Sequence, residues 1–289
     1  MSAFGISDPS SETIPSRSFF GNLGNWLNYL WAMLLINPLI VMTTIVMGSM
    51  SAAASFVDRS GRFQHACSRI WSRIILFVSG IRVQVEGLDQ VESTGKYVFC
   101  ANHQSYMDIP VLLVSLPFQL CFAAKKELFK LPFVGGHLRR AGHFSVNREN
   151  PLTAMRALGR SVGSIREGTQ VIIFPEGRTS RDGKIGRFKG GAFTIAERSR
   201  AEIVPVTIQG TRKILRPGSL HVRGGPVQVT IGGPIPSNSM SPAEMAAAVR
   251  ETVVAEFDST RVWCRSERRE GSKYEQTLGR HSDSLRRKK

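Results

Sequence analysis

His103 and Asp108 lie five residues apart, directly after the apolar run 97–101. A carboxylate that accepts a hydrogen bond from one ring nitrogen of a histidine fixes its tautomer and raises the basicity of the other nitrogen. That second nitrogen can then take a proton from an attacking hydroxyl, which is general base catalysis. The pair therefore predicts a catalytic base, His103, that is oriented by Asp108.

The spacing of this pair sets a condition on the local structure. Five residues turn a continuous helix by about 500°, which leaves the two side chains roughly 140° apart. They can meet only if His103 lies in a turn before a helix whose first turn contains Asp108. Pro110 favours this placement because proline is tolerated in the first turn of a helix. The competing interpretation is that Asp108 only caps the helix and that His103 is an ordinary loop histidine.

Alternating strands and helices must position the pair. Runs of β-forming residues occur at 82–85, 96–101, 119–123, 143–146, 169–174, 203–208 and 227–231, and helical patterns occur at 109–116, 131–140, 153–166, 191–198 and 242–257. This alternation predicts an α/β fold with a mostly parallel sheet flanked by helices. In such folds ligands bind beyond the carboxyl ends of the strands, which is where His103 is expected.

Charged residues follow three other predicted strands. Arginine offers a planar donor fork that suits phosphate, and Glu176 could accept a hydrogen bond from a substrate hydroxyl. A solvated charged turn is the competing interpretation for each of these segments. The candidate residues for binding an anionic substrate are Lys125, Arg148, Glu176, Gly177, Arg178 and Arg181.

A glycine-rich segment, residues 186–191, precedes a predicted helix. Glycines let backbone N–H groups approach an anion, and the start of a helix favours negative charge. The segment lacks the spacing of a Walker motif, so nucleotide hydrolysis is poorly supported.

Several of these motifs together resemble the glycerophospholipid acyltransferases, and they most resemble the bacterial 1-acyl-sn-glycerol-3-phosphate acyltransferases. The resemblance covers roughly residues 97–212. It rests on Asn102, His103 and Asp108 of an NHxxxxD motif, on residues 125–128 with Pro132 and Gly135, and on residues 142–148, 174–177 and 204–206.

The resemblance implies roles for the site residues. His103 would be the general base on a free glycerol hydroxyl, with Asp108 orienting it. Lys125 would hold the phosphate or the developing oxyanion. Arg148, Glu176 and an arginine that follows the motif at residues 174–177 would bind the glycerol phosphate.

The motif that begins at residues 174–177 departs from the family pattern. The family usually has Glu-Gly-Thr-Arg, whereas Arg178 here follows Gly177 directly and precedes Thr179. A shift by one place would turn the side chain elsewhere in an extended segment, although it need not do so in a turn. Arg178 is the first candidate for the phosphate and Arg181 the second.

The implied reaction is acyl transfer from a thioester donor to the sn-2 hydroxyl of lysophosphatidic acid, which gives phosphatidic acid. Acyl-CoA or acyl carrier protein would be the co-substrate, and no other cofactor is expected. A sibling enzyme that acylates glycerol 3-phosphate or another lysolipid is the alternative. A membrane-anchored nucleic-acid-binding protein is a remote alternative, because the basic residues lack interleaved aromatic residues and a recognisable module.

The N-terminal region carries a membrane signal. Residues 26–57 contain no charged side chain, and a helical span needs about 20 apolar residues. Pro38 is expected to divide this run, which leaves a kinked span or a hairpin in one leaflet. Residues 61–79 form an amphipathic helix pattern with Arg62, Arg69 and Arg73, which favours the lipid interface over packing on the soluble core.

Charge and composition complete the expected organisation. The formal net charge of +16 favours an anionic partner, such as an anionic membrane surface. The predicted regions are a mobile leader (1–18), a membrane-associated helical segment (19–80), the acyltransferase domain (81–264) and a basic, disordered tail (265–289). The catalytic domain is expected on the cytoplasmic side of the membrane, which is the inner membrane if the source is bacterial.

The four cysteines are scattered along the chain. Cys67, Cys100, Cys121 and Cys264 show no CxxC spacing and no close Cys/His spacing. We therefore expect neither a metal site nor a disulfide framework. Cys100 and Cys121 lie within apolar runs and are expected to be core residues.

Overall fold

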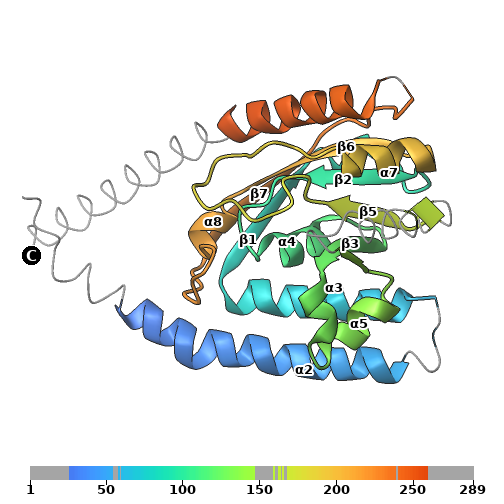
Figure 1. Ribbon diagram of the computed structural model, residues 1–289. Coiled ribbons are helices and arrows are strands. Elements are labelled where there is room, and N and C mark those ends of the chain that lie inside the picture. Colours follow the sequence, from blue (N-terminus) through green and yellow to red (C-terminus); the bar gives the residue numbers. More distant parts are fainter. Residues whose placement is uncertain are drawn as a thin grey trace, which may run out of the picture.

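The computed structural model describes residues 26–54, 58, 60–146, 159, 162–163, 165, 168–238 and 240–259. A seven-stranded sheet in the order β1-β7-β6-β2-β5-β3-β4 forms its centre (Figure 1). All neighbouring strands are parallel except β6 and β7, which are antiparallel. The strands are β1 (Ile81–Glu86), β2 (Tyr97–Ala101), β3 (Leu120–Lys125), β4 (Phe144–Val146), β5 (Gln170–Ile173), β6 (Glu202–Gln209) and β7 (Gly225–Ile231).

Helices cover both faces of this sheet. On one face lies α4 (Asp108–Ser115), which is covered in turn by α3 (Arg62–Val78) and then by α2 (Asn37–Ala54) and α5 (Val134–Arg140). On the other face lie α7 (Gly191–Ser199) and a C-terminal helix, residues 242–259. The predicted α/β class is confirmed. Shorter elements are η1 (Ala32–Ile36), η2 (Leu88–Gln90), η3 (Lys126–Lys130) and α8 (Thr211–Ile214).

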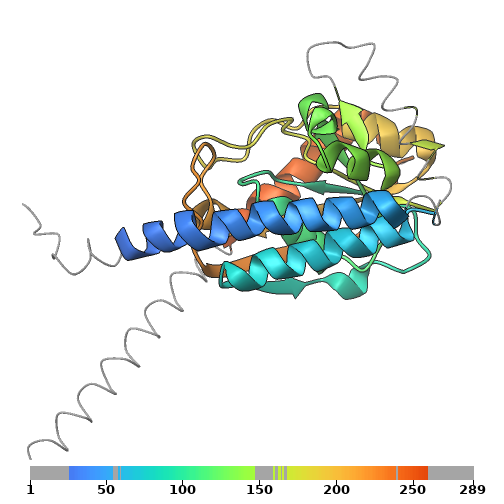
Figure 2. The ribbon, with the colours of Figure 1, turned by 90° about the horizontal axis from the view of Figure 1, so that it is seen from below.

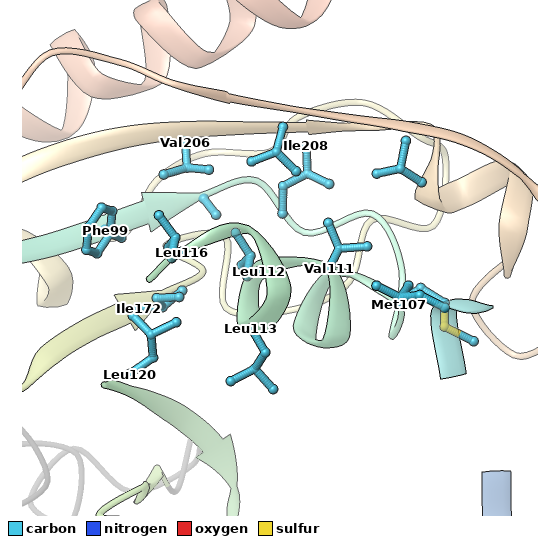
Figure 3. Close-up of a cluster of buried hydrophobic side chains, with 14 of the residues drawn as sticks. Phe99, Met107, Val111, Leu112, Leu113, Leu116, Leu120, Ile172, Val206 and Ile208 are labelled. Atoms are coloured by element: carbon cyan, nitrogen blue, oxygen red, sulfur yellow. The ribbon is translucent and has the colours of Figure 1, made fainter. Parts of the chain in front are cut away.

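The core explains why the central strands are continuously apolar. All five residues of β2 are buried, because helices cover both faces of this parallel part of the sheet. Figure 3 shows Leu112 of α4, and Leu116 directly after that helix, among Phe99, Ile172 and Val206, which come from β2, β5 and β6. This packing fixes α4, and with it the turn between β2 and α4, against the centre of the sheet.

The N-terminal helix does not break at Pro38. Residues Trp26–Ala54 form one helix whose length and apolar character would allow it to cross a membrane, and most of it is exposed. A π-helical turn, η1, precedes the proline, and the N–H of Asn37 donates to the carbonyl of Ala32. This wider turn accommodates a residue that has no N–H and would clash with an ordinary helical turn. The chain therefore does not reverse at Pro38, and the expected division of the run is wrong.

Helix α3 is more firmly packed than its sequence suggested. It lies between α2 and α4, beside α2 in the view of Figure 2. Arg69 donates to the carbonyl oxygens of Leu116 (2.7 Å) and Phe118 (2.9 Å), beyond the C-terminal end of α4, instead of facing lipid headgroups. Only Phe63, Ile70 and Phe77 among its large apolar side chains are strongly exposed. Packing on the core, the less favoured alternative, describes most of this helix.

The remaining sequence predictions divide into two groups. Each predicted strand is present with its ends within two residues of the expected positions. Cys100 and Cys121 are buried core residues, as expected. The predicted leader (1–18), the basic tail (265–289) and most of the predicted helix 153–166 lie outside the described residues.

Candidate active site

His103 and Asp108 meet at the carboxyl end of β2. Nδ1 of His103 lies 2.8 Å from Oδ2 of Asp108, and both residues are buried. His103 lies in the turn before α4, and Asp108 is the first residue of that helix, which is the arrangement that the spacing required. An ionised carboxylate can only accept, so this bond places the proton on Nδ1 and leaves Nε2 with a free lone pair.

The carboxylate of Asp108 points back into the turn and does not cap the helix. Its Oδ2 atom also accepts hydrogen bonds from the backbone N–H groups of Gln104 (2.7 Å) and Ser105 (2.9 Å). No side-chain capping bond is present at the start of α4. The interpretation of Asp108 as a simple helix cap is therefore wrong. Its three donors fix the position of the carboxylate, and the carboxylate in turn fixes the imidazole ring.

Glu176 holds the same turn from another strand. Its Oε1 atom accepts from the backbone N–H of His103 (2.8 Å), and its Oε2 atom accepts from the backbone N–H of Gly186 (2.9 Å). Burial raises the pKa of this carboxyl, while the two backbone hydrogen bonds act in the opposite direction. Glu176 therefore connects two backbone segments, and its predicted contact with substrate stays a prediction.

Two further side chains fix the turn, and the sequence motifs gave them no role. The ring of Phe174, at the end of β5, stacks on His103 with a centroid distance of 4.1 Å and an interplanar angle of 18°. The side-chain amide of Asn102 donates to the carbonyl of Ile208 (2.9 Å) and accepts from its N–H (2.7 Å). The only sequence signal for either role is position, because each residue follows a buried strand directly.

The predicted basic residues lie around this buried centre but are exposed. Arg178 and Arg181 follow β5 in a turn, so the one-place shift of the arginine does not act through an extended segment. Lys125 ends β3, is exposed and lies 3.6 Å from Glu127. Arg148 lies outside the described residues.

The backbone conformation at position 177 favours glycine. Gly177 has a φ of 71°, and a Cβ there would lie 3.0 Å from Nζ of Lys189. The N–H of Gly177 donates to the carbonyl of Phe174 at 3.0 Å, which closes the turn. Gly177 thus shapes the turn that presents Arg178 and Arg181 to solvent.

The glycine-rich segment uses backbone donors to build this site. The N–H of Gly186 donates to Glu176, and the N–H of Lys189 donates to the carbonyl of Pro175 at 3.0 Å. These two groups are therefore engaged within the protein, although the sequence suggested that the segment's N–H groups would face an anion. The segment ends at Gly190, and α7 begins at Gly191.

An apolar cavity of about 200 Å³ lies beside α4. Ile109, the residue after Asp108, is part of its wall, together with Leu113 of the same helix. The rest of the wall comes mainly from α2, α3, β3 and α5, with Gly48, Trp71, Phe122 and His137 among the lining residues. Trp71 donates to the hydroxyl of Thr44 at 3.0 Å, so these polar groups are paired and the wall is chiefly apolar.

Among the residues that the structure describes, no three His, Cys, Asp or Glu side chains gather into a set that could hold a metal ion. The chemistry available at this edge of the sheet is that of an oriented histidine base beside exposed cations. Such a site can deprotonate a hydroxyl and bind an anionic group.

Comparison with known proteins agrees with this geometry. The profile of a protein family described as acyltransferase matches residues 82–209. A 1-acyl-sn-glycerol-3-phosphate acyltransferase of Bacillus subtilis is 33% identical over 165 residues, which are 56% of this chain and 78% of the Bacillus protein. The chain belongs to the acyltransferase family. The predicted resemblance to the acyltransferases is thereby confirmed.

Two further relatives extend the similarity of this acyltransferase. The crystal structure of the 1-acyl-sn-glycerophosphate acyltransferase PlsC from Thermotoga maritima is similar to it with a TM-score of 0.73 and 26% identity, over 82% of this chain and 98% of that chain. The chloroplastic 1-acyl-sn-glycerol-3-phosphate acyltransferase LPAT1 of Arabidopsis thaliana is 35% identical over 176 residues, 60% of this chain and 49% of the plant protein. The chain spans about half the length of the plant relatives that it matches.

Proposed function

We propose that the protein transfers an acyl group from a thioester donor to the sn-2 hydroxyl of 1-acylglycerol 3-phosphate, giving phosphatidic acid. The observation that carries the proposal is the buried bond of 2.8 Å between Nδ1 of His103 and Asp108, in a chain that belongs to the acyltransferase family. Relatives from bacteria, plants and animals carry the name 1-acyl-sn-glycerol-3-phosphate acyltransferase, which supports this choice of acceptor.

In this proposal His103 acts directly on the acceptor. Its Nε2 atom takes the proton of the hydroxyl as the oxygen attacks the carbonyl carbon of the thioester. The imidazolium that forms is stabilised by Asp108, and it then returns the proton to the departing thiolate. Lys125 or backbone N–H groups stabilise the oxyanion of the tetrahedral intermediate. No nucleophilic serine or cysteine of the enzyme is needed.

The phosphate of the acceptor binds to the exposed cations around the turn. Arg178 is our first candidate, with Arg181 and Arg148 as the others, because an arginine fork can engage two phosphate oxygens at once. Glu176 and Gly177 contribute by shaping this part of the site and not by touching the phosphate. The two backbone N–H groups that bind the Glu176 oxygens support this assignment.

The donor is acyl-CoA or acyl carrier protein, and its acyl chain enters the apolar cavity beside α4. Ile109, one residue after Asp108, is part of the cavity wall, which supports this route for the chain. A cavity lined by apolar side chains suits a hydrocarbon chain and excludes water from the reacting thioester.

The membrane supplies the lysolipid acceptor and receives the product. The apolar N-terminal helix associates with the bilayer through exposed side chains such as Trp26, Trp31, Leu34 and Met42. The catalytic domain then lies at the membrane surface on the cytoplasmic side, where the net charge of +16 favours anionic lipids.

An acyltransfer assay on the purified full-length protein tests the proposal. Two thioester donors, acyl-CoA and acylated acyl carrier protein, are each paired with lysophosphatidic acid, glycerol 3-phosphate and a lysolipid with an uncharged headgroup. We expect turnover with lysophosphatidic acid that exceeds turnover with the other acceptors. Preference for glycerol 3-phosphate would assign the chain to the sibling activity, and no turnover with any pair would reject acyl transfer.

A further inference from the structure

The C-terminal helix reaches the catalytic site through one arginine. Arg250, in helix 242–259, donates from Nε to the carbonyl of Gly186 (2.9 Å) and from a terminal nitrogen to the carbonyl of Ile185 (3.2 Å). We propose that Arg250 is a positioning residue for the reaction, because it holds the segment whose backbone secures Glu176 and, through Glu176, the catalytic histidine.

Each link of this connection is a hydrogen bond of ordinary length. Arg250 holds the carbonyl of Gly186, and the N–H of Gly186 donates to Oε2 of Glu176 at 2.9 Å. The other oxygen of Glu176 accepts from the N–H of His103 at 2.8 Å. The guanidinium thus acts on His103 through one carboxylate and never touches the reacting atoms.

The segment that Arg250 holds has no regular secondary structure of its own. Residues 178–190 form turns and irregular chain between β5 and α7. Ile185 and Phe188 anchor it by burial, whereas Gly186 is exposed and carries no side chain that could pack. A Cβ at Gly186 would lie 3.2 Å from Oε2 of Glu176, so the backbone approaches the carboxylate closely. Two hydrogen bonds from one guanidinium hold the carbonyl groups of Ile185 and Gly186 at this point.

The position of this peptide matters because the carboxylate of Glu176 is buried. A buried charge is costly unless hydrogen bonds compensate it, and each oxygen of Glu176 has a backbone N–H as its donor. If the peptide before Gly186 moves, Oε2 loses its donor, and the carboxylate can follow the loop or take up a proton. The first change releases the N–H of His103, and the second weakens its hydrogen bond to Oε1, so both let the turn that carries the base shift.

Arg250 lies outside the segment that matches the family profile, residues 82–209. The helix that carries Arg250 covers the sheet face opposite α4. Arg250 must therefore act on the site through the irregular segment 178–190. A choice of site residues from the family motifs alone would therefore omit Arg250.

The test compares Arg250→Met with Arg250→Lys, and Glu251→Gln serves as the matched control on the same helix because Glu251 is exposed. Methionine keeps an unbranched stem and removes the donors. We expect kcat of Arg250→Met to fall about 10- to 100-fold with KM for both substrates nearly unchanged, since small misplacements of catalytic groups cost rates of this size. Arg250→Lys should lose less, because it keeps one donor, and the control should match the wild type.

A second measurement separates positioning from simple stabilisation. Hydrogen exchange followed by mass spectrometry should show faster exchange in peptides that contain the amide of His103 in Arg250→Met, at a temperature where the protein remains folded. Wild-type kcat in Arg250→Met would overturn the proposal, and so would a reduced kcat with unchanged exchange at His103. If the methionine variant does not fold, Arg250→Lys must show the same two effects in weaker form, and its failure to do so is equally decisive.

The kinetic part of this test rests on the proposed function, but the exchange measurement does not. Absence of turnover in the wild type would reject the proposed function and leave the exchange result to decide on Arg250. Normal wild-type turnover with no effect of Arg250→Met in either measurement would reject only the role of Arg250.

Discussion

The catalytic turn and the basic residues around it differ in how firmly they are held. His103, Asp108 and Glu176 are buried, and hydrogen bonds of 2.7 to 2.9 Å connect them to one another and to backbone N–H groups. Arg178, Arg181 and Lys125 are exposed at the ends of neighbouring segments. Proton transfer requires fixed geometry, whereas long cationic side chains can adapt to a charged headgroup that arrives from a membrane. The difference suggests that kcat is determined at the buried centre and KM at the exposed rim.

The largest effect is expected from His103→Ala, which removes the base from the buried centre. A general base contributes about 10²–10⁴-fold, so kcat should fall by that factor. The fold should persist, because Phe174 and Asp108 lose only one contact each. Steady-state kinetics together with circular dichroism measure both points. Wild-type turnover in this variant would end the assignment of His103 as the base.

Asp108→Asn should have the next largest effect. An amide oxygen can replace Oδ2 as the acceptor, but it does not stabilise the imidazolium by charge. We therefore expect kcat to fall by about 10²-fold, with KM for the acceptor little changed. Asp89→Asn, at a carboxylate in η2 far from this motif in the sequence, is the control and should behave as wild type. A change confined to KM would place Asp108 in binding instead of orientation.

Arg178→Ala tests the exposed rim and should act on KM. Loss of one charge-assisted contact to the phosphate corresponds to about a tenfold rise in KM for lysophosphatidic acid, with kcat nearly constant. Arg181→Ala and Lys184→Ala, which alter exposed cations in the same loop, are the matched comparisons. If Arg181→Ala shows the larger rise, the phosphate contact moves to Arg181. A rise in neither arginine variant would move it to Arg148.

The last and smallest expected effect is on stability. It comes from three enclosed histidines other than His103. His137 bonds to the hydroxyls of Ser51 (2.7 Å) and Ser68 (2.9 Å), between α2, α3 and α5. Desolvation lowers its pKa to about 4 from an ordinary value of 6.5, and it lowers the pKa of His65 to about 4 and that of His143 to about 3. His103, in contrast, faces a carboxylate.

Because these folded-state pKa values are depressed, the unfolded chain binds protons first as the pH falls below 6.5. Stability is therefore complete above that pH and declines toward pH 4. Between pH 6.5 and 5 each histidine can cost up to about 2 kcal/mol of unfolding free energy. Thermal unfolding of wild type and His137→Gln at several pH values measures this. The variant should show a smaller decline on acidification, and an equal decline would exclude His137 as a contributor.

The sequence was sufficient for the fold and for the contact between His103 and Asp108. Strand periodicity placed every strand, because parallel strands buried on both faces form short apolar runs that end abruptly at polar residues. The spacing of His103 and Asp108 was compatible with contact in only one local arrangement, a turn followed by a helix. Both inferences depend on residues close together in the chain, for which geometry restricts the alternatives.

Inferences that depend on distant contacts were less successful. The sequence did not reveal that Glu176 accepts from the backbone N–H groups of His103 and Gly186, because no side-chain motif shows such donors. Its predicted contact with substrate stays a prediction. Helix α3 has the amphipathic pattern of an interfacial helix, yet Arg69 finds carbonyl acceptors beyond the end of α4. At Pro38 the rule that proline ends a helix failed, because a π-helical turn absorbs the missing donor.

The side chain of Asn102 acts as a surrogate peptide group. One N–H and the oxygen of its amide pair with the carbonyl and the N–H of Ile208, as backbone groups of a longer β2 would have done. The backbone can therefore end the strand at Ala101 while both backbone groups of Ile208 keep a partner. Among side chains of this length, only a primary amide has this pair of groups, so aspartate and leucine would each leave a buried backbone group of Ile208 unmatched. A single amide thus ends a strand abruptly without leaving a gap in the sheet, and the catalytic base begins at that exact point.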